Sequence, residues 1–103
     1  MEIRINNNQI KLKKTFRSVV AYESATNKSF NPKTISDTIL YFYCVCIASD
    51  TNLELSYDEF IDWLDDNPEE LGNFSKWIIE QNENESKLTA KKKKTSTKNK
   101  QQV

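Results

Sequence analysis

The chain has 103 residues, of which 37% are hydrophobic and 11% aromatic, and this length leaves room for one domain. It contains one glycine and two prolines, which argues against a β-sandwich or barrel because tight hairpin turns depend on glycine. It contains no histidine, no glycine-rich phosphate loop and no motif that places a base beside a serine or cysteine. The composition therefore favours a binding protein over an enzyme.

The formal net charge of zero hides three blocks of opposite sign. Residues 1–49 carry seven bases and three acids (+4), residues 50–85 carry twelve acids and one lysine (−11), and residues 86–103 carry seven lysines and no acid (+7). The lysine block has no arginine or aromatic residue to read or stack on bases, and the acidic remainder of the chain repels polyanions. Nucleic acid is therefore not the expected partner.

The N-terminus lacks the apolar stretch of a signal peptide, and the apolar run Ile39 to Ala48 is about half the length that spans a bilayer. We therefore expect a cytoplasmic protein with no membrane segment. Cys44 and Cys46, one residue apart in that run, are expected to be buried, reduced thiols. A zinc site would need carboxylates to complete it, and we expect neither a metal nor another cofactor.

The N-terminal residues are predicted to form a β-hairpin. Glu2 to Ile5 and Gln9 to Lys13 alternate apolar and polar residues, and Asn6 to Asn8 suit the turn because asparagine tolerates positive φ. The apolar residues of both segments fall on one face: Ile3, Ile5, Ile10 and Leu12.

A first helix is predicted after the hairpin. Thr15 is a suitable N-cap, and the helix is expected to run to about Thr26. Phe16, Val19 and Val20 stand at helical spacing and are expected to form its apolar side.

A second helix is predicted to begin after Thr34, with Asp37 in the capping-box position. Its later part, ILYFYCVCIA, is apolar on every side. A strand is the alternative for this run, but the capping signal and the length favour a helix. An all-apolar helix requires either a central position in the fold or a covered outer face.

Two further helices follow. Ser56 to Glu59 form a capping box, and the third helix is expected to stop near Asp66 because Asn67 precedes a proline. Asn67 is then expected to cap a fourth helix, with Pro68 at its first position, and the aromatic residues end after about Gln81. The two helices have apolar stripes formed by Phe60, Ile61, Trp63 and Leu64, and by Leu71, Phe74, Trp77 and Ile78.

The predicted fold is mainly α, with an N-terminal β-hairpin, about four short helices and a disordered C-terminal tail. The folded domain is expected to span residues 1–85. Residues 86–103 have too little apolar surface to offset the entropy of ordering, and we expect them to be disordered.

The chain has many large rings for its size, and they allow two interpretations. They can simply form the core, or some of them can anchor a partner or a second copy. The candidates for such a surface are Phe42, Tyr43, Phe60, Trp63, Phe74 and Trp77.

A set of carboxylates is predicted on the third helix and the start of the fourth. Their spacing indicates a solvated acidic face rather than a general acid/base pair. An alternative function follows from it: an acidic adaptor or inhibitor that mimics nucleic acid and binds a host protein. The residues are Asp58, Asp62, Asp65, Asp66, Glu69 and Glu70.

The order of elements resembles the tail assembly chaperones of tailed bacteriophages and prophages. The resemblance covers about residues 1–80: an opening hairpin, then TFRSVVAYESATNKSFNPKTISD, ILYFYCVCIASD and LSYDEFIDWLDDNPEELGNFSKW. No single residue carries a functional role over from that family.

The resemblance implies a function, partners and a location. Such proteins keep the long helical tape measure protein soluble, help to bring tail tube subunits to it, and act in the cytoplasm of the bacterial host. The charge blocks separately predict self-association, through contact of the basic residues 1–49 with the acidic residues of a neighbouring copy. Many are made in a short and a frameshifted long form. The run Lys91, Lys92, Lys93 and Lys94 suits a slippery message, and this chain would then be the short form.

Overall fold

The computed structural model describes the backbone of residues 1–100 and the side chains of residues 1–84. It confirms the predicted fold class, a mainly helical chain that opens with an antiparallel hairpin. The elements are β1 (Glu2–Ile5), β2 (Asn8–Lys11), α1 (Phe16–Thr26), α2 (Ile35–Ser49), α3 (Tyr57–Asp66) and α4 (Glu69–Lys100).

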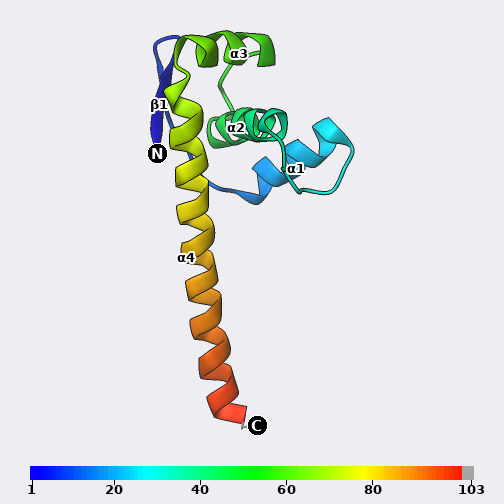
Figure 1. Ribbon diagram of the computed structural model, residues 1–103, viewed down its shortest axis with the longest axis vertical. Helices are drawn as coiled ribbons and strands as arrows, with labels where there is room; N and C mark the ends of the chain where they lie inside the picture. Colours follow the sequence, from blue (N-terminus) through cyan, green and yellow to red (C-terminus); the bar gives the residue numbers. More distant parts are fainter. Residues whose placement is uncertain (101–103) are drawn as a thin grey trace.

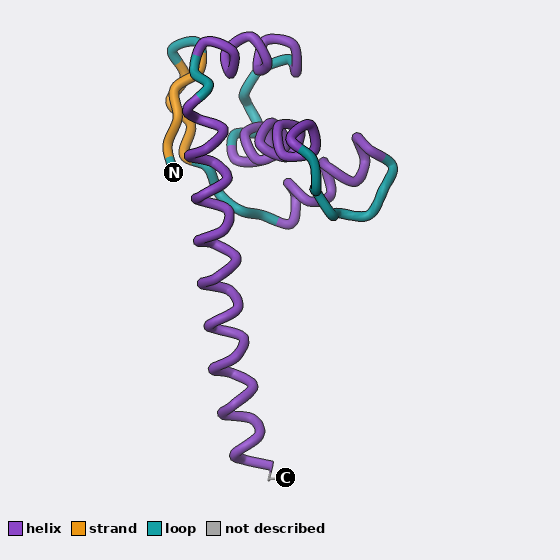
Figure 2. Tube along the Cα trace, viewed as in Figure 1, coloured by secondary structure: helices purple, strands orange, loops and turns teal. Residues whose placement is uncertain are grey.

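Helix α2 lies at the centre of the body. It packs against α1 on one side and against α4 and β2 on the other. Figure 1 shows α3 at the end of the body where α4 begins, and the hairpin beside the first part of α4. Figure 2 shows the same arrangement by element type, with α4 continuing well past the other elements. The folded body therefore consists of helices packed around α2, with the hairpin along one side.

The hairpin forms as its sequence predicts. Ile5 pairs with Asn8, so the loop between the strands consists of Asn6 and Asn7 alone. Their φ values of 49° and 69° are those of a type I′ turn, which matches the twist of the two strands. The predicted apolar face is buried, since Ile3, Ile5, Ile10 and Leu12 are each at most 3% exposed.

Three helices begin at the predicted caps. The hydroxyl of Thr15 accepts from the backbone N–H of Ser18, and α2 and α3 start with complete capping boxes. In the box of α3, the Ser56 hydroxyl accepts from the Glu59 N–H at 3.1 Å, and the Glu59 carboxylate accepts from the Ser56 N–H at 2.9 Å. These bonds satisfy donors that the first helical turn otherwise leaves without partners.

Replacing Ser56 by alanine is expected to lower the free energy of unfolding by about 1 kcal/mol, because the cap of α3 is lost. Chemical denaturation monitored by circular dichroism measures the change. Ser24→Ala, an exposed serine inside α1, is the control and should leave stability nearly unchanged. Equal effects of both substitutions would contradict the role assigned to the capping box.

The junction between α3 and α4 differs from the prediction in one respect. The side-chain amide of Asn67 donates to the carbonyl of Trp63 at 2.9 Å, so this group caps the end of α3. The backbone carbonyl of Asn67 accepts from the N–H of Glu70 at 3.0 Å, and α4 starts at Glu69. One residue thus closes one helix with its side chain and opens the next with its backbone.

Helix α4 is longer than predicted. Its backbone runs from Glu69 to Lys100, whereas the sequence predicts short helices. No proline or glycine follows Gly72 to interrupt it. The disorder expected for residues 86–103 is not tested, because their side chains and the whole of residues 101–103 lie outside the described part.

Aromatic rings from α2 explain why that helix is apolar on every side. Phe42 is fully buried and faces α3 and α4. Tyr41 contacts Tyr22 of α1 and Phe30 of the following loop, with ring centroids 6.2 and 4.8 Å away, and its ring also lies 5.8 Å from that of Phe74 in α4. Tyr43 packs on α3 and donates from its hydroxyl to the carbonyl of Leu55 at 2.6 Å. The helix therefore occupies the central position, and its apolar sides are covered by the chain's own elements.

Candidate interaction surfaces

The aromatic surface expected from the sequence is largely core. Phe42, Phe60 and Phe74 are at most 1% exposed, so they cannot contact a partner at the surface of this fold. Their rings pack on one another: Phe42 stacks on Phe74 at 4.2 Å and meets Phe60 edge-on at 5.1 Å. The other three candidates, Tyr43, Trp63 and Trp77, are half-buried at the margin of this cluster.

The outer face of α1 exposes apolar side chains that sequence reasoning assigned to the core. Phe16 is 91% exposed and Val20, one turn later, is 59% exposed. The side of α1 that faces α2 is formed instead by Ser18 and Tyr22, both buried. The Ser18 hydroxyl donates to the Thr15 carbonyl at 2.6 Å, which allows this small polar residue to be buried. In the sequence, the small side chain of Ser18 could have identified the side of α1 that packs on α2, because a small residue lets two helices approach closely.

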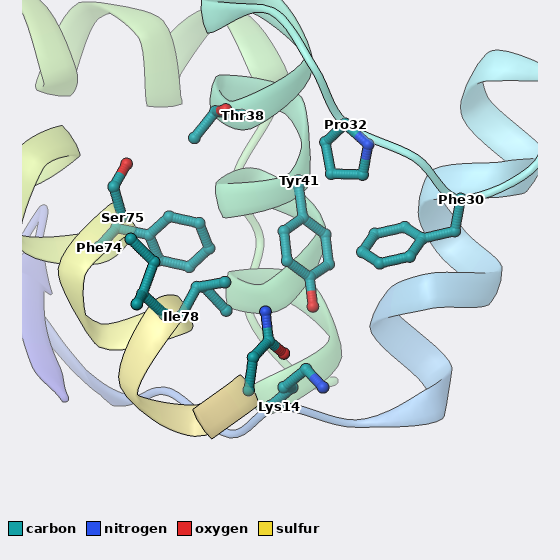
Figure 3. A pocket seen from close by; sticks show the side chains of 10 residues that line it. Lys14, Phe30, Pro32, Thr38, Tyr41, Phe74, Ser75 and Ile78 are labelled. Carbon is teal, nitrogen blue, oxygen red and sulfur yellow. The ribbon is translucent and has the colours of Figure 1, made fainter. Parts of the chain in front are cut away.

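A groove lies between α2, α4 and the loop that joins α1 to α2 (Figure 3). Its volume is about 340 Å³, near the lower end of the range for small-molecule pockets. Figure 3 shows Tyr41 between Phe30 and Phe74, with Thr38 and Pro32 toward one end and Lys14 toward the other. The groove is lined by Lys14, Phe30, Pro32, Thr38, Tyr41, Phe74, Ser75, Ile78, Ile79 and Asn82.

The lining of this groove is suited to an apolar side chain. Tyr41 and Phe74, with ring centroids 5.8 Å apart, are buried in its wall, and Ile79 at its margin is 58% exposed. The polar groups of the lining come from Lys14, Thr38, Ser75 and Asn82, and they form no arrangement of nucleophile and base. The groove is therefore a candidate binding surface.

Most of the acidic residues predicted on α3 and early α4 are exposed. Asp58, Asp62, Asp65, Asp66 and Glu69 are exposed, and Glu70 is half-buried. The Glu70 carboxylate accepts from the side-chain amide of Asn73 at 2.7 Å. Within the side chains described, to residue 84, none of the six carboxylates forms an ion pair. Up to residue 84, therefore, no base of the chain neutralises these carboxylates through an ion pair.

Both cysteines are free and buried, as predicted. Burial raises the pKa of the Cys44 thiol to about 11 from an ordinary value of 9.0. Burial raises the pKa of Cys46 further, and the neighbouring Cys44 adds to the effect. The thiolate is the reactive form, so these residues are structural at neutral pH. Among the described residues no group of three or more cysteine, aspartate or glutamate side chains is placed to hold a metal ion.

The lysine run Lys91–Lys94 belongs to the part of α4 whose side chains are not described, so no surface can be assigned to it. None of the helices in the described residues combines the length and the apolar character that crossing a bilayer requires.

Comparison of the chain with protein-family models, with curated proteins and with solved structures gave no match.

Proposed function

We propose that this chain is a tail assembly chaperone of a tailed bacteriophage or prophage, which binds the tape measure protein in the cytoplasm of the bacterial host. The sequence resemblance over residues 1–80 motivates the proposal. The observation that supports it is the combination of exposed apolar side chains on α1, an apolar groove beside α4 and a strongly acidic face on α3.

Each of these surfaces has a use in keeping a long amphipathic helix soluble. An apolar helix face needs apolar contacts for anchoring, which α1 and the groove can offer. The complex also needs charge to stay in solution, and residues 50–85 supply a net charge of −11. Delivery of tail tube subunits follows from the resemblance alone.

Gene order and co-expression test the proposal. A coding sequence for a very long helical protein is expected immediately downstream. When that protein is expressed with and without this chain, its soluble fraction should rise several-fold in the presence of the chain. A downstream protein that is fully soluble alone, and that does not bind the chain in co-purification, would overturn the proposal.

The frameshift hypothesis has its own test in the message. If this chain is the short form of a pair, the codons for Lys91–Lys94 should be an A-rich slippery run with an overlapping downstream frame. Mixed AAG codons without such a frame would exclude the slip at this position. Mass spectrometry of the expressed protein would detect the longer product.

A second candidate function is an acidic adaptor or inhibitor that mimics nucleic acid. The exposed carboxylates of α3 favour it, since none of them forms an ion pair with another described side chain. Under this alternative, the chain should capture a nucleic-acid enzyme, and DNA should compete for that enzyme. The variant Asp62→Lys/Asp65→Lys should abolish capture. If the double variant still binds the downstream helical protein as the wild type does, that result would favour the chaperone function instead.

A further inference from the structure

Phe16 is the most exposed large apolar side chain in the described part of the chain, at 91%. It occupies the first position of α1 and points away from the buried residues Ser18 and Tyr22, so no rearrangement within α1 brings it into the core. Single exposed apolar residues are ordinary in soluble proteins. Here Val20 extends the same outward face by a further turn at 59% exposure, which makes the ring part of a patch.

The groove beside α4 is large enough for this ring. A cavity of about 150 Å³ is sufficient to hold benzene, and the groove has about 340 Å³. Its accessible lining is apolar, since Phe30, Pro32 and Ile78 are half-buried and Ile79 is exposed, and this suits contact with another apolar ring. An apolar ring and an apolar groove are therefore both present in one chain.

The ring and the groove are also close to each other along the chain. Lys14 lines the groove and precedes Phe16 by two residues. A two-fold axis relates each surface of one copy to the same surface of its partner, so a ring beside a groove can enter the partner's groove while the partner's ring enters its own. This placement suits a closed dimer.

Charge favours a second copy as the occupant. Lys13 and Arg17 flank Phe16 in the sequence, whereas two exposed acids of α4, Glu80 and Glu83, each follow a groove-lining residue directly in the sequence. None of these four side chains forms an ion pair within the described residues. The whole chain has a formal charge of zero, so copies meet without net repulsion.

We infer that two copies of this chain associate by inserting Phe16 of each into the α2–α4 groove of the other. The base-flanked start of α1 then lies against the acidic margin of the partner's α4. This contact does not depend on the tail-assembly proposal, and a tape measure helix or another partner in the same groove is an alternative outcome of the test.

The test uses the full chain in sedimentation velocity over a concentration series. The wild-type chain should show a concentration-dependent dimer, and Phe16→Asp should raise its dissociation constant at least about tenfold, because the ring no longer fills the groove. Aspartate is tolerated in the first turn of a helix, so the monomer should keep its circular dichroism spectrum. Ile35→Asp is the matched control, since Ile35 is 71% exposed at the start of α2 but does not line the groove.

Two groove variants complete the test. Ser75→Phe fills the groove from α4, and Ile79→Lys places a cation at its margin without altering the core. Each alone should weaken the dimer to a similar extent as Phe16→Asp. A mixture of Phe16→Asp with Ser75→Phe should form a mixed dimer, because one intact ring then meets one intact groove.

Three results would overturn the inference. They are a wild-type chain that stays monomeric to millimolar concentration, a dimer that Phe16→Asp leaves intact, or equal weakening by Ile35→Asp. A monomeric chain whose binding of the tape measure helix is lost in Phe16→Asp and Ile79→Lys would assign the same surfaces to that partner instead.

Discussion

Replacing Phe42 by alanine is expected to lower the free energy of unfolding by about 3–5 kcal/mol, a large fraction of the stability of a domain this small. Phe42 is 0% exposed, stacks on Phe74 with an interplanar angle of 4°, and meets Phe60 and Trp63 edge-on. Removing the ring leaves a cavity where α2, α3 and α4 meet, and the three neighbouring rings cannot all move to fill it.

Urea denaturation followed by circular dichroism measures this loss, and Phe16→Ala provides the matched control. It deletes the same side chain at a position that is 91% exposed, so the free energy of unfolding should change by less than about 0.5 kcal/mol. Both variants should be measured at a concentration where the chain is monomeric. Equal destabilisation by the two would mean that Phe42 is not the centre of the core.

The local signals in the sequence predicted the elements and their starts. The asparagines at the hairpin turn take positive φ, and the helices begin at Thr15, Thr34 and Ser56 as expected. Turns and caps depend on residues within four positions of one another, so both partners of each interaction can be read from a short stretch of sequence. The end of α4 was predicted less well, because no single residue there stops the helix.

Which rings are buried could not be predicted in the same way. Phe16 and Phe42 are the same residue type, each predicted on the apolar side of its helix, yet one is 91% exposed and the other 0%. The difference depends on which side of α1 packs on α2, and the small Ser18 decided it. The groove was not foreseen, because its walls come from segments far apart in the sequence, including Phe30, Tyr41 and Phe74.

Alkaline pH is expected to produce the second large effect, through the two buried thiols. The pKa of Cys44 rises from 9.0 to about 11 on folding, and that of Cys46 is raised still more. Between the unfolded and the folded pKa of each thiol, the unfolded chain releases a proton that the folded chain keeps, so the free energy of unfolding falls as pH increases. The thiols' contribution is fully present below pH 9 and is lost above it by about 1.4 kcal/mol per pH unit for each thiol.

Urea denaturation at pH 7, 8, 9 and 10 measures this loss, and a Cys44→Ala/Cys46→Ala variant separates the thiols from other groups. Burial also raises the pKa of Tyr22, Tyr43 and Tyr57, so the variant should keep a shallower decline toward high pH. The variant is less stable at pH 7 because buried atoms are removed, and the comparison therefore rests on the slope. Identical slopes for the two proteins between pH 9 and 10 would show that the thiols ionise as readily in the folded chain as in the unfolded one.

In that case Cys44 and Cys46 would also react with a thiol reagent at pH 8 without denaturant, whereas burial predicts that they react only after unfolding.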